Sequence, residues 1–351
     1  MADSKVNAKD ILYVKHFNSP IPKGCVLSHP YDSLTPEAIL DAVEVAGYLP
    51  TGGLLALNSY ENRVYQIALD DGSFVVAKFY RPDRWSDAAI LEEHAFSLEL
   101  AEREIPVVAP LAGDEGETLH QHGGFRYALF PRRGGRAPEL DDAEVRFRIG
   151  RLLGRIHAVG AMKTFRERPG IGPEFGRSAV DWLLENDWLP PEHRGQYKEL
   201  ASELLESIET AFASIPRLRM QRLHGDCHPG NILWTEAGAH FVDLDDSRNG
   251  PAIQDLWMLV SGEGTELREQ MFDVLAGYEE FHDFDFRELR LIEPLRALRI
   301  LNYAGWLARR WDDPAFPRAF PWFEAGPYWD EHIMTLREQL SRIEASARDD
   351  D

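Results

Sequence analysis

The chain has 351 residues, enough for two lobes that each bury a hydrophobic core. Hydrophobic residues make up 44% and charged residues 28% of the sequence, as in ordinary globular proteins. The formal net charge of -21 argues against a protein that holds nucleic acid through its phosphates, because such binding requires clustered Lys and Arg. The same charge disfavours anionic membrane surfaces.

Cysteine content and hydropathy indicate the cellular compartment and exclude some classes of partner. Cys25 and Cys227 cannot form a disulfide framework, and no C-x-x-C pair indicates a zinc site. The N-terminus has no apolar signal core, and no apolar run approaches the roughly 18–20 residues that span a bilayer. We therefore expect a cytoplasmic protein that binds neither nucleic acid nor membrane, and we expect it to be a monomer.

Residues 1–30 show no clear periodicity and are interpreted as an N-terminal extension. The next hundred residues have the pattern of a small antiparallel sheet crossed by a helix. The expected strands are residues 55–69, 73–80, 118–122 and 125–130. The expected helices are residues 36–46, with Thr35 as N-cap, and residues 86–101, with Ser86 as N-cap.

The pattern changes to helices after a turn-rich linker at residues 131–136. The expected helices are residues 141–159, 197–213, 266–281, 286–310 and 328–347, with short strands at 232–235 and 240–244. Strands followed by helices predict an α+β fold with segregated elements. The predicted division is an extension (1–30), a β-rich N-lobe (31–131) and a helical C-lobe (132–351).

The densest group of chemically useful residues is Leu223-His-Gly-Asp-Cys-His-Pro-Gly-Asn-Ile-Leu-Trp234, followed by Phe241-Val-Asp-Leu-Asp-Asp-Ser247. Phosphoryl transfer from ATP needs a group that accepts the proton of the acceptor hydroxyl, and it needs oxygen ligands for magnesium. We therefore predict Asp226 as the base and Asn231 and Asp243 as ligands of Mg²⁺. Lys78, one of only seven lysines, is the candidate cation for the phosphates.

The motif H-x-D-x-x-x-x-N, followed by a strand that ends in Asp, resembles the catalytic and metal loops of eukaryotic-like kinases. Its variant H-G-D-x-H-x-x-N is that of the aminoglycoside and choline phosphotransferases. The segments 57–65, 90–96 and 242–252 resemble the stress response kinase A family of bacterial Ser/Thr protein kinases. This similarity extends over residues 33–342, nearly the full chain.

The resemblance implies a bilobal protein-kinase-like fold and the same roles for the three residues of the catalytic and metal loops. It also implies that Ser59 contacts the phosphates of ATP, that Phe130 and its neighbours contact adenine, and that Asp255 braces the catalytic loop. Lys78 would pair with a carboxylate of the following helix, and the spacing favours Glu93 over Glu92.

The sequence departs from the kinase pattern in two places. The expected phosphate loop has no glycine-rich motif, and Asn58, Ser59 and Asn62 stand where glycines would be. The stretch between Asp243 and Asp255 is too short for a long activation loop, so regulation by phosphorylation of such a loop is not expected.

The resulting hypothesis is a Mg-ATP kinase, active in stress response, that phosphorylates Ser/Thr hydroxyls of proteins, including its own. A small-molecule kinase for aminoglycosides, choline or amino alcohols would use the same catalytic loop. A pseudokinase that binds ATP without transfer is the non-enzyme alternative. A metallohydrolase with a zinc site at His224, Asp226 and His228 would leave Asn231 and Lys78 unexplained. A dehalogenase-type phosphatase would need a lysine downstream of its D-x-D motif, which this chain lacks.

Overall fold

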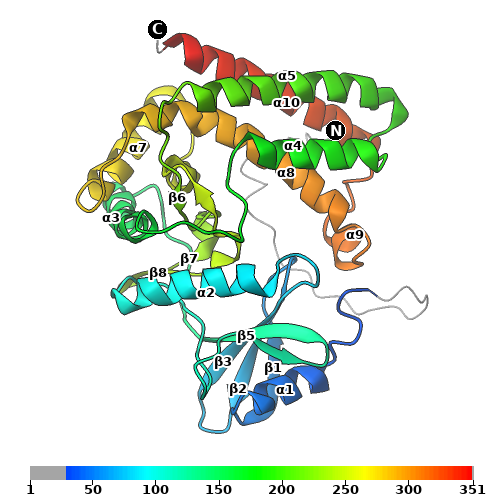
Figure 1. Ribbon diagram of the computed structural model, residues 1–351, viewed down its shortest axis with the longest axis vertical. Coiled ribbons are helices and arrows are strands. Elements are labelled where there is room, and N and C mark those ends of the chain that lie inside the picture. Colours follow the sequence, from blue (N-terminus) through cyan, green and yellow to red (C-terminus); the bar gives the residue numbers. More distant parts are fainter. Residues whose placement is uncertain (1–28, 350–351) are drawn as a thin grey trace. The chain divides into compact units, whose positions relative to one another are not determined.

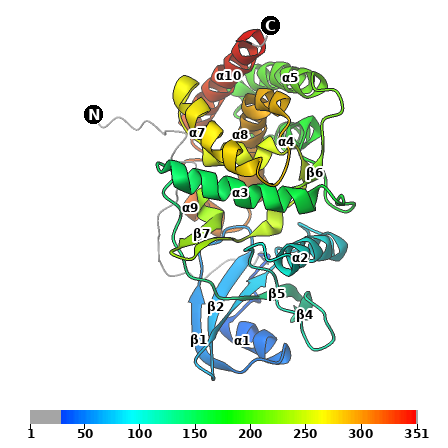
Figure 2. The ribbon, with the colours of Figure 1, turned by 90° about the vertical axis from the view of Figure 1, so that its left-hand side faces the viewer.

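The computed structural model describes residues 29–349, so the expected extension over residues 1–30 lies almost entirely outside the described residues. The chain divides into two compact units, drawn in Figures 1 and 2. One unit comprises the described residues up to Pro138 together with His228–Asp243; the other comprises Glu139–Cys227 and the chain from Leu244 onward. Division by compactness thus groups residues 228–243 with the N-terminal part, whereas the predicted division grouped them with residues 132–351.

The first unit contains a five-stranded sheet with the order β1-β2-β3-β5-β4, in which all neighbours are antiparallel. The strands are β1 (Pro50–Ala56), β2 (Arg63–Leu69), β3 (Phe74–Phe79), β4 (His120–His122) and β5 (Phe125–Pro131). The two predicted hairpins are present. Their turns contain Gly72 at φ 81° and Gly124 at φ 86°, in the left-handed region that glycine enters without a steric cost.

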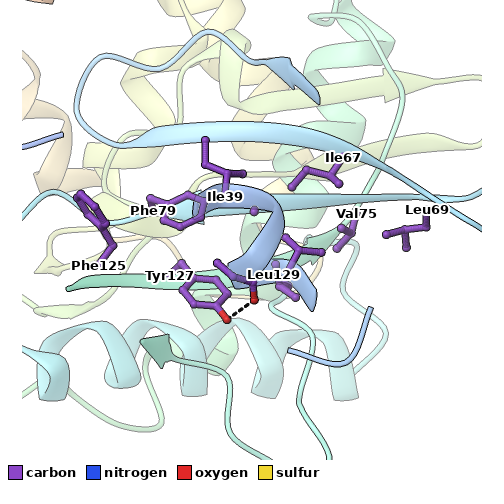
Figure 3. Packing of buried hydrophobic residues seen from close by; sticks show 11 residues of the cluster. Ile39, Ile67, Leu69, Val75, Phe79, Phe125, Tyr127 and Leu129 are labelled. Atoms are coloured by element: carbon purple, nitrogen blue, oxygen red, sulfur yellow. Dashed lines mark hydrogen bonds between the residues drawn. The ribbon is translucent and has the colours of Figure 1, made fainter. Parts of the chain in front are cut away.

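One face of this sheet packs against helix α1 (Pro36–Val45), which Thr35 caps as predicted by accepting the N–H of Ala38 at 3.2 Å. The aliphatic and aromatic core on this face is drawn in Figure 3. Along β3 it takes every second residue, because side chains alternate between the two faces of a strand. Tyr127 ties α1 to the sheet by donating its hydroxyl hydrogen to the carbonyl of Ala42 at 2.5 Å.

The opposite face packs against helix α2 (Asp87–Glu102), which begins at the predicted cap Ser86. Ile90 of α2 lies in a buried cluster with Tyr80 and Ala128. Since Tyr80 lies on this face, the alternation of β3 directs Lys78 to the same face. The strand pattern alone therefore separates Lys78 from the aliphatic core around α1.

The first unit is completed by a hairpin of β7 (Ile232–Thr235) and β8 (Gly238–Phe241). Backbone hydrogen bonds fix it on both sides. Phe241 donates its N–H to the carbonyl of Pro106 at 2.8 Å, and Trp234 donates its N–H to the carbonyl of Arg136 at 2.7 Å. These bonds explain why a hairpin from the middle of the chain belongs to the N-terminal unit.

The second unit is mainly helical. Its longer helices are α3 (Ala143–Gly160), α4 (Pro173–Glu185), α5 (Pro191–Ala213), α7 (Gly264–Tyr278), α8 (Ile292–Arg309) and α10 (Gly326–Asp349). Its shorter elements are β6 (Gln221–Arg222), β9 (Asn249–Gly250), α6 (Ile253–Leu256), α9 (Ala315–Ala319) and 3-10 turns at Leu244–Asp246, Trp257–Leu259 and Phe286–Leu291. The principal pairs are α3 with α7, α4 with α8, and α5 with α10. Figures 1 and 2 show α5 and α10 lying side by side.

The expected strand at residues 55–69 is interrupted, because β1 ends at Ala56 and β2 begins at Arg63. Three further differences from the prediction have physical reasons. Helix α4 was not predicted, because Gly176 weakens its helical pattern; the glycine lies where α4 packs on α8, and a Cβ there would lie 2.6 Å from Leu298 Cδ2 and displace the end of that side chain. The expected helix at 286–310 begins as a 3-10 turn, because Pro294 lacks the N–H that an earlier helical start would use. Strand β8 ends at Phe241, before the left-handed residue Asp243.

Within residues 29–349, no helix is both long and apolar enough to cross a membrane.

Candidate active site

Asp243 lies just beyond β8 in a backbone conformation that side chains rarely adopt. Its φ is 59°, which costs a non-glycine residue about 1 kcal/mol or more. Such strain concentrates at functional sites, where the surrounding structure enforces it. The turn ends the strand and leaves the Asp243 side chain 52% exposed. The predicted metal ligand is therefore an accessible carboxylate on a constrained backbone.

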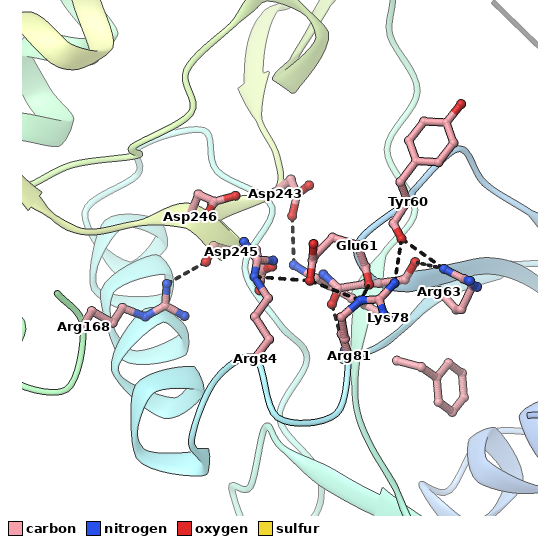
Figure 4. A network of polar contacts seen from close by, with 12 residues as sticks. Tyr60, Glu61, Arg63, Lys78, Arg81, Arg84, Arg168, Asp243, Asp245 and Asp246 are labelled. Atoms are coloured by element: carbon pink, nitrogen blue, oxygen red, sulfur yellow. Dashed lines mark hydrogen bonds and ion pairs between the residues drawn. The ribbon is translucent and has the colours of Figure 1, made fainter. Parts of the chain in front are cut away.

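Lys78 contacts this carboxylate directly. Lys78 Nζ donates a hydrogen bond to Asp243 Oδ1 at 2.9 Å, although the two residues are 165 positions apart in the chain (Figure 4). The lysine side chain is only 8% exposed, and a buried ammonium group needs a paired charge. The fold thus brings together the predicted phosphate-binding cation and the predicted metal carboxylate.

Asn231 ends the 3-10 turn Pro229–Asn231 that leads into β7. The carbonyl of His228 accepts the N–H of Asn231 at 2.9 Å, and the carbonyl of Asn231 accepts the N–H of Val242 at 3.0 Å. Asn231 therefore pairs with the residue immediately before Asp243. Both predicted metal ligands belong to the first unit, at the same end of the β7–β8 hairpin.

The other predicted residues of the first unit lie on three different elements. Ser59 is half-buried in the connection between β1 and β2, and Phe130 is half-buried on β5. Glu93 on α2 is 2% exposed, and its carboxylate lies 3.8 Å from His94 Nε2. The roles of these residues toward ATP, and the pairing of Glu93 with Lys78, remain predictions.

The connection between β1 and β2 is held by an arginine that the sequence did not single out. Arg81, 4% exposed, donates from Nε to the carbonyl of Glu61 at 3.0 Å and lies 3.2 Å from its carboxylate (Figure 4). The N–H of Arg81 is accepted by Asn62 Oδ1 at 3.1 Å. Arg84 Nε lies 3.6 Å from the same Glu61 carboxylate. A loop without a glycine-rich motif is therefore fixed by polar side chains.

Asp226, the predicted base, belongs to the second unit. Arg299 Nη1 of α8 donates a hydrogen bond to Asp226 Oδ1 at 2.6 Å. The backbone N–H of Asp226 points to His224 Nδ1 at 3.4 Å. His224 is 1% exposed, so its side chain is part of the buried support of this loop. No motif marked Arg299, because only the packing of α8 brings it to the catalytic loop.

Asp255 braces the catalytic loop as the resemblance implied. Its carboxylate, fully buried on α6, accepts the N–H of His224 and the N–H of Gly225, each at 2.8 Å. His157 Nε2 of α3 lies 2.9 Å from Asp255 Oδ2, and Tyr278 lies 3.0 Å from the other ring nitrogen. The sequence did not indicate His157, since a single histidine on the apolar face of a helix carries no distinctive signal.

Gly225 is required by close packing as well as by its backbone angle. Its φ is 87°, and a Cβ at this position would lie 2.1 Å from the carbonyl oxygen of Asp246. The segment containing Asp246 is fixed in turn by Arg168, which donates to the carbonyls of Asp245 at 2.7 Å and Ser247 at 3.0 Å. The loop around Asp226 is therefore rigid on both sides.

Cys227 has no features of a catalytic thiol. The side chain is fully buried, and burial raises the pKa of the Cys227 thiol well above its ordinary value. The nearby carboxylates of Asp255 and Asp226 raise this pKa further. The thiolate needed for nucleophilic chemistry is thus disfavoured at neutral pH.

The donor set around Asp243 fits magnesium better than zinc. Among residues 29–349, no group of three or more His, Cys, Asp or Glu side chains is arranged to hold a metal ion, so the zinc alternative at His224 and His228 gains no support. Magnesium is held differently, by one or two oxygen ligands of the protein together with the phosphates of the substrate and water. The exposed carboxylate of Asp243 and the amide oxygen of Asn231 match that requirement.

This architecture defines a class. An antiparallel sheet with a nearly buried lysine, a helical unit with an H-G-D loop, and a strand ending in an exposed Asp together describe the kinases of the aminoglycoside and choline phosphotransferase type. The comparisons with known proteins agree. The model of the phosphotransferase enzyme family matches residues 54–292.

Two relatives extend the match to most of the chain. Stress response kinase A of Escherichia coli (strain K12) is 46% identical over 315 residues, covering 90% of this chain and 95% of the relative. Serine/threonine protein kinase RdoA of Salmonella typhimurium is 46% identical over 314 residues, covering 88% of this chain and 93% of the relative. The chain therefore belongs to the phosphotransferase enzyme family and, within it, to the group of stress response kinase A.

Solved structures share the fold at low sequence identity. A microcompartment-associated aminopropanol kinase has a TM-score of 0.64 at 17% identity, covering 89% of this chain and 98% of its own. Amicoumacin kinase hAmiN, in complex with AMP-PNP, Ca²⁺ and Ami, has a TM-score of 0.63 at 18% identity, covering 82% of this chain and 92% of its own. These similarities confirm the predicted fold class.

Proposed function

We propose that this phosphotransferase is a Mg-ATP-dependent kinase that phosphorylates Ser/Thr hydroxyls of proteins and acts in stress response. The contact that carries the proposal is the 2.9 Å hydrogen bond from Lys78 to Asp243. It joins a nearly buried cation to an exposed carboxylate, the pair of groups that phosphoryl transfer from ATP requires. The choice of a protein acceptor rests on the names of the two relatives, each of which is 46% identical to this chain.

The residues of the first unit would bind the donor. Lys78 and the Ser59 loop face the phosphates, and Phe130 contributes apolar surface for the adenine. Asn231 and Asp243 would hold Mg²⁺, which would neutralise negative charge on the phosphates. Because Arg81 and Asn62 already fix the β1–β2 connection, little ordering of this loop is needed on binding.

The transfer step assigns the proton to Asp226. The acceptor oxygen forms a bond to the γ-phosphorus of ATP, the bond from this phosphorus to the bridging oxygen breaks, and ADP leaves. The hydroxyl proton passes to the carboxylate of Asp226, which Asp255 and Gly225 hold in place through the loop backbone. The product is a phosphorylated Ser or Thr.

The first test measures transfer from γ-labelled ATP, with Mg²⁺, to a generic Ser/Thr protein substrate and to the chain itself. The wild type should label protein hydroxyls, whereas Asp226→Asn should lose about 10³-fold or more in rate, of the order expected when a catalytic base is removed. Undiminished transfer by the Asp226→Asn variant would falsify the assignment of the base.

A second outcome would change the proposed class of acceptor. Aminopropanol and choline kinases share the fold with TM-scores of 0.64 and 0.59. Transfer to a panel of amino alcohols and aminoglycosides, with none to protein, would identify a small-molecule kinase. Nucleotide binding without transfer to any hydroxyl would identify the pseudokinase alternative.

A further inference from the structure

The predicted base makes an ion pair that bears on the choice of acceptor. Arg299 Nη1 lies 2.6 Å from Asp226 Oδ1, with side chains that are 33% and 27% exposed. Both residues belong to the second unit. A guanidinium group carries five N–H donors, and among residues 29–349 the hydrogen bond that Arg299 donates goes to Asp226. One face of this arginine therefore holds the base, and a third of its side chain remains exposed.

The neighbouring arginine on the same face of α8 has a different partner. Half-buried residues recur on one face of α8 at Arg296, Arg299, Tyr303 and Trp306. Arg296, one turn before Arg299, pairs with Glu293 at 2.6 Å and lies over the ring of Trp257. The two arginines thus differ in function, because the first is paired with a structural carboxylate and the second with the predicted base.

We propose that Arg299 selects acceptors in which an anionic group lies next to the reacting hydroxyl, and that the acceptor is a Ser or Thr flanked by Asp or Glu in a protein. This inference rests on the proposed role of Asp226 as the base. A hydroxyl that reaches Asp226 comes within a few ångströms of the guanidinium group. A flanking carboxylate then gains a charge-assisted hydrogen bond, whereas the ammonium group of an amino alcohol or aminoglycoside is repelled.

The strength of a hydrogen bond to a charged group sets the expected size of the preference for an acidic acceptor. A hydrogen bond to a charged group changes binding by roughly ten- to a hundredfold. The formal net charge of -21 opposes anionic partners at long range. At physiological ionic strength the Debye length is about 8 Å, so the local arginine dominates at contact distance.

The test uses three matched Ser peptides that differ in one flanking residue, which is Glu, Gln or Lys, together with aminopropanol. The steady-state constants kcat and KM are measured for the wild type, Arg299→Gln and Arg299→Lys. The wild type should prefer the Glu peptide over the Lys peptide by at least tenfold in kcat/KM, mainly through KM. Arg299→Gln should remove this preference, and Arg299→Lys should restore part of it.

Arg296→Gln is the matched control, since it removes the same charge from the same helix face. It should retain the preference for the Glu peptide. Thermal unfolding of each variant establishes that the chain is folded, and rescue by Arg299→Lys distinguishes the loss of a charge from the loss of the fold.

Three outcomes would overturn the inference. If Arg299→Gln raises kcat/KM equally for all peptides, Arg299 is an inhibitory contact. If it lowers kcat/KM equally for all peptides, Arg299 is only a positioning residue for Asp226. A wild-type preference for aminopropanol or the Lys peptide would contradict the expected charge selection. Failure of the wild type to transfer to any acceptor is a different result, because it contradicts the proposed function itself.

Discussion

At the scale of residues, two positions of the candidate site have a left-handed backbone for different reasons. Asp243 has φ 59° and Gly225 has φ 87°, both in the left-handed region. Asp243 bears a side chain there, and its carboxylate contacts Lys78 at 2.9 Å. Gly225 bears none, because the Asp246 carbonyl occupies the space of a Cβ. The left-handed region therefore accommodates an exposed carboxylate at one position and close packing at the other.

We expect Gly225→Ala to damage the catalytic loop more than an ordinary surface change. The added Cβ would lie 2.1 Å from Asp246 O, so the loop must move, and a left-handed alanine adds about 1 kcal/mol of strain. The free energy of unfolding should fall by about 2 kcal/mol or more, with a loss of transfer activity, measured by urea unfolding and γ-label transfer. Gly195→Ala on α5, where a Cβ meets no atom within 4 Å, is the control. Equal stability of the two variants would contradict the assigned contact.

At the scale of elements, the brace Asp255 depends on a second buried carboxylate. Glu288, in the 3-10 turn Phe286–Leu291, is 2% exposed and accepts the N–H of Ile253 at 3.0 Å. Ile253 begins α6, the helix that carries Asp255. Burial raises the pKa of Glu288 from 4.5 to about 7. The turn before α8 therefore supports the catalytic loop through α6.

This pKa shift predicts a dependence of stability on pH. Because the folded pKa is raised, the stability that protonated Glu288 contributes is fully present below about pH 4.5 and is lost as the pH rises through about 7. Each pKa unit corresponds to about 1.4 kcal/mol, so the full change is about 3 kcal/mol. The Glu288→Gln variant, whose amide oxygen still accepts from Ile253, should lose less stability between pH 5 and pH 8 than the wild type. Glu338→Gln, at an exposed position of α10, should behave as the wild type does.

At the scale of the whole molecule, the predicted site residues are divided between the two units. Lys78, Asn231 and Asp243 belong to the unit with the sheet, and Asp226 and Asp255 belong to the helical unit. The boundaries fall within the motif itself, after Cys227 and after Asp243. The predicted metal ligands and the predicted base therefore belong to different units, and variants in each unit should separate the two predicted functions.

Thermal unfolding with and without nucleotide tests whether the two predicted functions can be separated. At 100 times its dissociation constant, a ligand stabilises the folded state by about 2.7 kcal/mol, which raises Tm by a few degrees. Mg-ATP should raise the Tm of the wild type and of Asp226→Asn, but not that of Asp243→Ala. An equal rise of Tm for Asp243→Ala would show that the metal and phosphates are held elsewhere.

Local signals in the sequence predicted much of the fold. The caps Thr35 and Ser86 and the glycine turns begin and end elements through hydrogen bonds and backbone angles of neighbouring residues, so they need no tertiary information. Helix α4 was missed because Gly176 weakens its helical pattern, although that glycine lies in the packing of α4 on α8. The H-G-D and strand-Asp motifs indicated the candidate residues and the family because their spacing is local, and the family is confirmed by the match over residues 54–292.

The sequence by itself determined most of the succession of strands and helices, the family and the candidate residues Asp226, Asn231 and Asp243. Only the tertiary structure decided that Lys78 contacts Asp243, that Arg299 pairs with Asp226, and that Glu288 supports α6. Such contacts join positions far apart in the chain. By composition alone, many other arginines and glutamates could be the partners in these contacts. Their selection depends on which helix faces pack together, and this is a property of the folded core and not of any local pattern.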